Sequence, residues 1–214
     1  MEIIKMLLDY ILHFDVHLDF IITNYNSFAY LILFLIVFVE TGLVVMPFLP
    51  GDSLLFAVGA FAARGTLNPI LCAILMILGA FCGDVVNYFI GYRAGPKVFN
   101  NETSRWFNKN YLLKAQSFYE KYGTKTIIMA RFVPIVRTFA PFVAGVGKMN
   151  YKRYISFSIM GAMLWVILFI SAGYFFGNIP AIKSNFKIVI LAIIFISILP
   201  AIVELIKEKK AALK

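Results

Sequence analysis

Apolar runs alternate with short polar and basic segments along the chain. The first long run, 28–63, has 36 residues, of which only Glu40 and Asp52 are charged. It is too long for a single crossing of a bilayer, which takes about 20 residues. Residues that break helices lie in its middle: Pro47, Pro50 and Gly51. The pattern therefore predicts two short helices with a break between them.

Three later runs have the length of a membrane-spanning helix. The runs 69–92 and 154–177 have 24 residues each, and each fits one crossing with some tilt. The run 186–206 predicts a third spanning helix. The only charged residue in the first of these runs is Asp84.

The apolar run 126–147 is interrupted by Pro134 and Pro141, and it carries Arg131 and Arg137. These breaks leave legs of about eight to ten residues, which is roughly 12–15 Å of helix. Such a leg covers only half of a hydrocarbon core about 30 Å thick. The run is therefore predicted to form a re-entrant hairpin, which enters and leaves the membrane on the same side.

Positive charge between the apolar runs predicts their orientation. The segment 93–125 and the tail KEKKAALK are basic, so both should face the cytoplasm. The chain is then one membrane domain in four parts: an N-terminal interfacial helix (1–27), a first repeat (28–95), a second repeat (105–177), and a C-terminal spanning helix with its basic tail (184–214).

A weak internal repeat supports this division. GYRAG at 91–95 and GYFFG at 173–177 lie 82 residues apart, each at the end of a long helix. The two copies have opposite predicted orientations, as in inverted-repeat transporters. The predicted fold is an all-α integral membrane protein with two opposed re-entrant hairpins, about three spanning helices and amphipathic interfacial helices.

Composition agrees with a membrane protein, because 61% of the residues are hydrophobic and 14% are charged, against roughly 45–50% and about 25% in soluble domains. The net charge of +9 comes from cations beside apolar runs, which the positive-inside rule explains without nucleic acid. Cys72 and Cys82 lie too far apart on one predicted helix for a disulfide. His13 and His17 have no third ligand nearby, so neither a metal nor another cofactor is predicted. The motifs of common enzymes and ATP-driven pumps are also missing from the sequence.

The two broken runs contain four charged residues: Glu40, Asp52, Arg131 and Arg137. Four charges facing lipid would cost on the order of 10 kcal/mol, so these side chains should face each other or water. One interpretation is structural, with ion pairs that hold two hairpins together. The other is functional, with arginines that bind an anionic group and acids that exchange protons. Asp84 is either an accessory residue of such a site or a residue that bonds a neighbouring helix.

Three stretches resemble the DedA family of bacterial inner-membrane proteins, part of the superfamily that includes the VTT-domain lipid scramblases. They are FVETGLVVMPFLPGDSLLFAVGAFA at 38–62, GDVVNYFIGYRAG at 83–95 and RFVPIVRTFAPFVAGVGKMNYKRYISFSIMGAMLW at 131–165. The resemblance implies opposed re-entrant hairpins in the bacterial inner membrane. It also implies that Glu40, Asp52, Arg131 and Arg137 correspond to the acids and arginines required for activity in that family.

The residues and the resemblance together predict a proton-linked transporter of a lipid phosphate. Arg131 and Arg137 would bind the phosphate of undecaprenyl phosphate or a related phospholipid, and Glu40 and Asp52 would couple its movement to protons. Two alternatives stay open. One is proton-driven exchange of small cationic solutes or drugs, and the other is a scaffold that organises lipids or proteins without transport. An enzymatic reaction is not predicted, and a homo-oligomer is neither predicted nor excluded.

Overall fold

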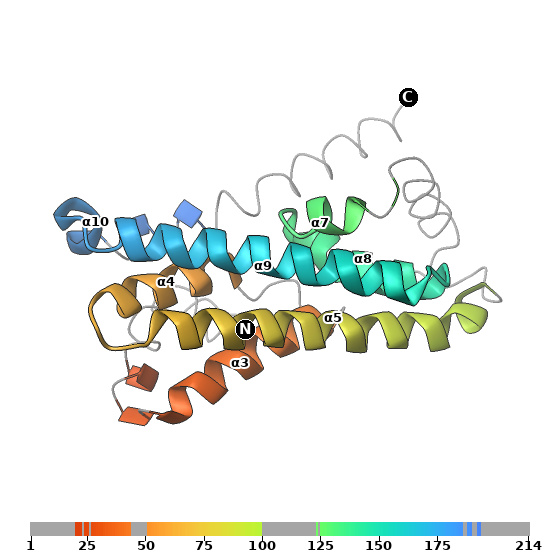
Figure 1. Ribbon diagram of the computed structural model, residues 1–214, viewed down its shortest axis with the longest axis horizontal. Coiled ribbons are helices and arrows are strands. Elements are labelled where there is room, and N and C mark those ends of the chain that lie inside the picture. The colour runs from red at the N-terminus through yellow and green to blue at the C-terminus, as the bar shows by residue number, and fades with distance from the viewer. Residues whose placement is uncertain are drawn as a thin grey trace, which may run out of the picture. The chain divides into compact units, whose positions relative to one another are not determined.

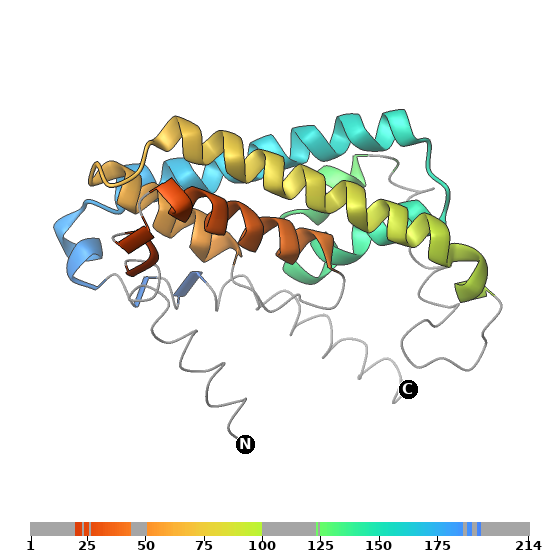
Figure 2. The same cartoon turned by 90° about the horizontal axis from the view of Figure 1, so that it is seen from below.

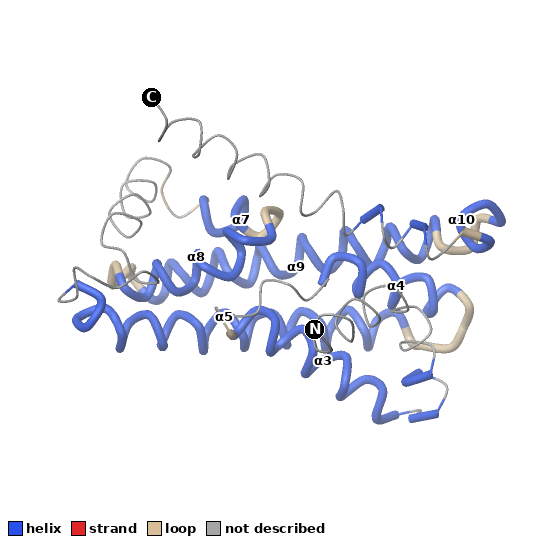
Figure 3. The backbone as a smooth tube through the Cα atoms, turned by 180° about the vertical axis from the view of Figure 1, so that it is seen from behind, coloured by secondary structure: helices blue, strands red, loops and turns tan. Residues whose placement is uncertain are grey.

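The computed structural model describes helices and the turns between them (Figure 1). It describes residues 20–22, 24–25, 27–43, 51–99, 123, 125–185, 188–189 and 192–193, without the side chains of 95–99, 134–135, 181 and 183. Every regular element in this part of the chain is a helix (Figure 3). The following predictions lie outside the described residues: most of the interfacial helix 1–27, with His13 and His17; Pro47 and Pro50; most of the basic segment 93–125; most of the third spanning helix; and the basic tail.

The first apolar run forms two helices, α3 (Ser27–Gly42) and α4 (Gly51–Ala63). They have 16 and 13 residues, so each is about 20–24 Å long and shorter than the hydrocarbon core. The predicted break in this run is confirmed, because α3 ends at Gly42 and α4 begins at Gly51. Asp52 lies in the first turn of α4, where a carboxylate interacts favourably with the helix dipole.

The two continuous runs form the long helices α5 (Pro69–Phe99) and α9 (Tyr151–Phe176). Their apolar parts have 26 residues each, which confirms two helices long enough to cross a membrane. Asn68 caps α5, because its side-chain oxygen accepts hydrogen bonds from the backbone N–H groups two and three residues later, at 3.0 and 3.1 Å.

The second broken run forms α7 (Thr126–Ala130) and α8 (Pro134–Val146), and a short α10 (Pro180–Ser184) follows α9. The predicted break at Pro134 is confirmed, since this residue begins α8, where the missing N–H of proline is tolerated. The predicted break at Pro141 is wrong, because this residue lies inside α8. A proline removes only one helical hydrogen bond, and the turn that follows is held by the packing of Gly145 on α5.

The chain divides into two compact units. Unit 1 contains Met1–Leu35, Pro50–Met76 and Val166–Lys214, and unit 2 contains Ile36–Leu49 and Ile77–Trp165. Unit 1 therefore includes α4, the first part of α3, the start of α5 and the end of α9, and unit 2 includes α7, α8, the end of α3, most of α5 and the first part of α9 up to Trp165.

Helices in unit 1 approach closely at two glycines. Gly59 of α4 lies against the backbone carbonyl of Ile170 in α9, and Gly173 of α9 lies against the backbone carbonyl of Phe56 in α4. A Cβ atom at either glycine would overlap the opposing carbonyl oxygen. Glycine at both positions is what lets the two backbones come this near.

Unit 2 contains a crossing of the same kind, between α8 and the second half of α5 (Figure 2). Gly145 of α8 lies against the carbonyl of Tyr88 in α5, and Gly91 of α5 lies against the carbonyl of Phe142 in α8. Gly91 and the Gly173 of unit 1 have equivalent contacts, and they are the first glycines of GYRAG and GYFFG. The repeated motif therefore corresponds to a repeated helix crossing.

An aromatic core fills unit 2 next to this crossing. Tyr88 is buried with Ile127, Ala144 and Tyr154, and its ring stacks on that of Tyr154 at 4.5 Å between centroids. Its hydroxyl donates a hydrogen bond of 2.7 Å to the carbonyl of Met149. These contacts tie α5, α7, α8 and α9 together and position the polar side chains described next.

Candidate functional site

Four charged side chains are buried in unit 2: Glu40, Asp84, Arg131 and Arg137. None of them exposes more than 5% of its surface. Glu40 lies near the end of α3, Asp84 within α5, Arg131 directly after α7, and Arg137 in the first turn of α8. Two acids and two arginines, all ionised, carry no net charge.

Glu40 and Arg137 form one ion pair, in which Nη2 of Arg137 donates to Oε1 of Glu40 at 2.5 Å. Asn87 of α5 supports this pair from the backbone side. Its Nδ2 donates to the carbonyl oxygens of Thr41 at 3.0 Å and Thr138 at 2.8 Å. These threonines directly follow the two charged residues in the sequence, so Asn87 holds together the two backbone segments that carry the ion pair.

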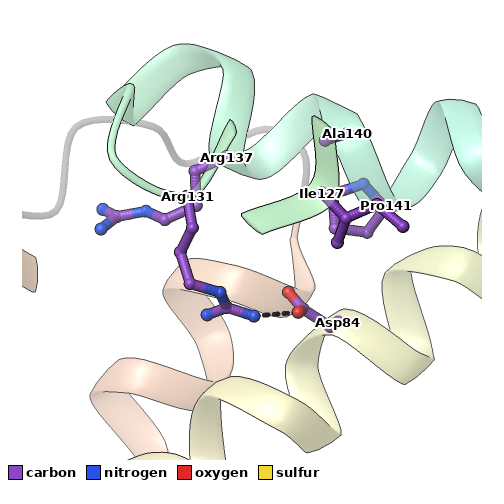
Figure 4. Close-up of a pocket in the computed structure, with 6 residues that line it drawn as sticks. All are labelled: Asp84, Ile127, Arg131, Arg137, Ala140 and Pro141. Atoms are coloured by element: carbon purple, nitrogen blue, oxygen red, sulfur yellow. Dashed lines mark hydrogen bonds and ion pairs between the residues drawn. The ribbon is translucent and has the colours of Figure 1, made fainter. Parts of the chain in front are cut away.

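Arg131 and Asp84 form the second ion pair, which joins Nη2 to Oδ2 (Figure 4). Two residues of α9 hold Asp84 in place: Ser158 Oγ donates to the same carboxylate oxygen at 2.5 Å, and the Tyr154 hydroxyl donates to the Asp84 backbone carbonyl at 2.9 Å. Gly161 of the same helix lies directly beside the arginine, because a Cβ atom there would contact Nε of Arg131 at 3.4 Å.

The indole ring of Trp165 faces both guanidinium groups. Its centroid lies 4.6 Å from Cζ of Arg137 and 5.9 Å from Cζ of Arg131, and the side chain is fully buried. An aromatic face within about 6 Å attracts a cation, and the attraction is stronger away from water. Trp165 therefore links the two ion pairs into one site.

A small pocket opens onto this site, and Figure 4 shows the side chains that line it: Asp84, Ile127, Arg131, Arg137, Ala140 and Pro141. It leaves room for about one water molecule. Nη1 of Arg131 is buried and has no hydrogen-bond partner among the described residues. A buried donor of this kind is suited to an acceptor oxygen from a ligand.

The predicted site residues fall in both units. Glu40, Arg131 and Arg137 lie together in unit 2, whereas Asp52 is a buried residue of α4 in unit 1. The partner of Arg131 is Asp84, which the sequence left as an accessory residue or a bond to a neighbouring helix. Asp84 bonds neighbouring helices, as one of these two interpretations predicts, and it also lies among the buried charges of unit 2.

Sequence reasoning missed Ser158 and Trp165. The sequence of α9 contained a signal for these residues. Polar, small or aromatic side chains lie along it at intervals of four, three and four residues: Tyr154, Ser158, Gly161 and Trp165. This interval places them on one face of a helix. A face that combines hydroxyls, a glycine and a tryptophan in an apolar helix indicates contact with polar groups.

Residues 49–175 match the VTT domain family. The chain is 55% identical over 214 residues to Protein DedA of Escherichia coli (strain K12), covering 99% of this chain and 98% of that protein. It is 46% identical over 180 residues to an uncharacterized membrane protein of Mycobacterium tuberculosis (83% and 78% covered) and 34% identical over 155 residues to the inner membrane protein YqjA of E. coli (71% and 69% covered). No solved structure matches the chain. The domain match and the near full-length relative show that this chain belongs to the DedA family of VTT-domain membrane proteins.

Proposed function

We propose that this protein moves a lipid phosphate, undecaprenyl phosphate or a related phospholipid, across the bacterial inner membrane. The observation that carries the proposal is the pair of buried arginines in unit 2, Arg131 and Arg137, each bound to a carboxylate and both facing one indole ring. A buried ion pair contributes little net stability, because desolvation offsets most of the Coulomb attraction. Two such pairs among apolar helices therefore favour a role in binding or transport.

The chemistry of the guanidinium group favours a phosphate ligand. A phosphate offers acceptor oxygens of the same kind as a carboxylate, so it can replace Glu40 or Asp84 on the same donors. Arg131 brings Nη1 as a further buried donor. The apolar tail of the substrate would stay in the lipid while its head group passes the arginines.

Protons are proposed to accompany the lipid phosphate. A carboxylate that loses its arginine inside a membrane must gain a proton or another cation, since an isolated buried charge is costly. In unit 2, Glu40 would take up a proton in this way. In unit 1, Asp52, which is buried at the start of α4, would serve the same purpose.

The proposed path uses the two broken runs as opposed re-entrant hairpins. The lengths of α3, α4 and α8 support this arrangement, because none of them can cross a bilayer alone. The recurrence of the glycine crossing supports an inverted repeat. Basic segments favour a multi-pass topology with a cytoplasmic C-terminus, and the name of the relative YqjA favours the inner membrane.

A transport assay tests the proposal. Full-length protein in liposomes is expected to move labelled undecaprenyl phosphate faster than liposomes without protein. Arg131→Lys and Arg137→Lys keep the charge but lose the planar fork, so each should slow transport at least about tenfold. Arg64→Lys, an exposed arginine of unit 1, is the matched control and should leave the rate unchanged. Wild-type protein that moves no label, or lysine variants with wild-type binding and transport, would contradict the proposal.

The alternatives give different results in the same liposomes. An exchanger of cationic solutes would depend on the acids, so Glu40→Gln and Asp84→Asn would weaken solute binding more than either lysine variant. Its support is the presence of two buried carboxylates, Glu40 and Asp84, together with the indole ring of Trp165, an aromatic face that already lies over the Arg137 guanidinium and attracts cations. A scaffold would transport neither labelled undecaprenyl phosphate nor a cationic solute, and its function would depend on packing alone.

A further inference from the structure

We propose that Asp84 occupies the phosphate position on Arg131 until the substrate arrives, and that it takes up one proton when the head group displaces it. This inference rests on the proposed function. It adds the identity of the displaced group and the source of the proton uptake.

The pocket geometry requires a displacement. Asp84 and Arg131 both line the pocket, and their ion pair leaves room for only about one water molecule. A phosphate group is larger than a water molecule, so it cannot reach both terminal nitrogens of Arg131 while the carboxylate is bound to Nη2. Nη1 offers the first contact, because it is a buried donor with no hydrogen-bond partner among the described residues. The head group can bind there first and then replace Asp84 on Nη2.

Asp84 is better placed for displacement than Glu40. Glu40 does not line the pocket, and the backbone segments around its ion pair are held by the two hydrogen bonds of Asn87. Asp84 keeps a partner after it leaves Arg131, because the Ser158 hydroxyl can donate to a carboxylate or accept from a carboxylic acid. Side chains of α9 can therefore hold Asp84 in both its charged and its neutral form.

The charges around Asp84 fix the number of protons. The groups around it are Arg131 after α7, Arg137 of α8, and the hydroxyls of Ser158 and Tyr154 on α9, and Glu40 of α3 is paired with Arg137. This set is neutral when both acids are ionised. A phosphate monoester adds about −1.5 to −2 charges, so one proton on Asp84 and one on Glu40 restore neutrality. A phosphodiester adds one negative charge and needs only the proton on Asp84.

Proton uptake during binding tests this inference. The probe is geranyl phosphate, a short prenyl monoester, titrated calorimetrically into full-length protein in detergent, in buffers of different ionisation enthalpy. Geraniol, which lacks the phosphate, is the control ligand. Wild-type protein should take up protons on binding, and Asp84→Asn should take up about one proton fewer. The variant should also bind about tenfold tighter, because the internal competitor is gone.

Thermal melting gives a second readout of the same variant. Asp84→Asn removes the counter-ion of a buried arginine, so its Tm should fall in the absence of ligand. Geranyl phosphate should raise the Tm of Asp84→Asn more than that of the wild type, and geraniol should not distinguish the two proteins.

Ser158→Ala keeps the inference testable if Asp84→Asn does not fold. The hydrogen bond from Ser158 to the ionised carboxylate is stronger than its bond to the neutral acid, so its loss favours the neutral, displaced Asp84, and geranyl phosphate binding should persist to higher pH than in the wild type. Ser156→Ala is the matched control, because Ser156 is exposed and bonds only within its own helix, to the Lys152 carbonyl. Its pH profile should match the wild type.

The outcomes separate this inference from the proposed function. If wild-type protein binds and transports the phosphate but Asp84→Asn shows wild-type proton uptake and Tm gain, the role of Asp84 is wrong and the transport function stands. The same conclusion follows if Ser158→Ala and Ser156→Ala have identical pH profiles. If wild-type protein binds no geranyl phosphate, both the inference and the proposed function are overturned.

Discussion

The two units share a helix crossing but differ in the charges they bury. In unit 1 the crossing is formed by Gly59 and Gly173, and in unit 2 by Gly145 and Gly91. Among the described residues, unit 1 buries one charged side chain, Asp52, whereas unit 2 buries four. The crossing is therefore a structural feature common to both units, and the ion pairs of Glu40 with Arg137 and of Asp84 with Arg131 lie in unit 2.

The comparison of the two units shows that helix packing and the charged site depend on different kinds of residue. Close backbone packing at the crossings depends only on the absence of a Cβ atom, so it can recur wherever two glycines meet. The ion pairs depend on side chains from four segments that have to face one another: α3, α5, the turn after α7, and α8. Substitutions at the crossings should lower the stability of either unit, whereas substitutions of the paired charges should abolish the proposed transport.

The largest expected effect comes from removing one arginine of unit 2. Arg137→Ala takes away the arginine partner of buried Glu40, and breaking a buried pair in this way lowers the free energy of unfolding by about 3–5 kcal/mol. Arg64→Ala removes an exposed arginine of unit 1 and should change it by less than about 0.5 kcal/mol. Denaturation of both variants in detergent measures the contrast. Equal losses would mean that the unit 2 ion pair has no special role in the fold.

A charge exchange distinguishes a transporter from a scaffold. The structure pairs Glu40 with Arg137, so the exchange must combine Glu40→Arg with Arg137→Glu. The double variant should regain part of the stability lost in Arg137→Ala, because opposite charges again face each other. Transport of labelled undecaprenyl phosphate should stay about a hundredfold below the wild type, since a misplaced guanidinium no longer meets the phosphate. If the double variant regained the protein's cellular function while transport stayed low, the result would favour the scaffold.

Substitutions at the crossings should affect the two units alike. Gly59→Ala in unit 1 and Gly145→Ala in unit 2 each place a methyl group on an opposing backbone carbonyl oxygen, so each should lower stability by about 1–3 kcal/mol. Gly147→Ala is the control within unit 2, because its Cβ would lie 3.3 Å from the Val143 carbonyl oxygen, against 2.1 and 2.0 Å at the two crossings, and its effect should be smaller than theirs. If only one of the two crossing variants is destabilised, the equivalence of the crossings is wrong.

The smallest contrast concerns two asparagines. Asn87 of unit 2 donates to two buried carbonyls, so Asn87→Ala should lower stability by about 1–2 kcal/mol. Asn178 of unit 1 donates one exposed hydrogen bond of 3.1 Å to Ala63, and Asn178→Ala should change stability by less than about 0.5 kcal/mol. Thermal melting compares the two variants. A larger loss in Asn178→Ala would contradict the assigned role of Asn87.

Sequence alone predicted the features that depend on local physics. The membrane-length apolar parts of α5 and α9 follow from uninterrupted apolar runs, although α5 continues beyond its run to Phe99. The starts of α4 and α8 follow from Gly51 and Pro134. Pro141 was wrongly predicted to end a helix, because the effect of an internal proline depends on the tertiary packing around the next turn.

The charged site was predicted only in part. An acid or arginine in an apolar run signals a buried polar site, so Glu40, Arg131 and Arg137 were identified. The choice of Asp84 as partner of Arg131 depends on which faces of α5 and α9 meet, and one sequence does not contain this information. Trp165 was missed for the same reason, since its role follows from contacts with two arginines.

An experimental structure of the full-length protein in lipid nanodiscs that contain undecaprenyl phosphate would test the central claim most directly. The claim predicts density for the phosphate group within hydrogen-bond distance of both Arg131 and Arg137, with Asp84 turned away from Arg131. A head group bound elsewhere, while Arg131 still pairs with Asp84 and Arg137 with Glu40, would contradict it.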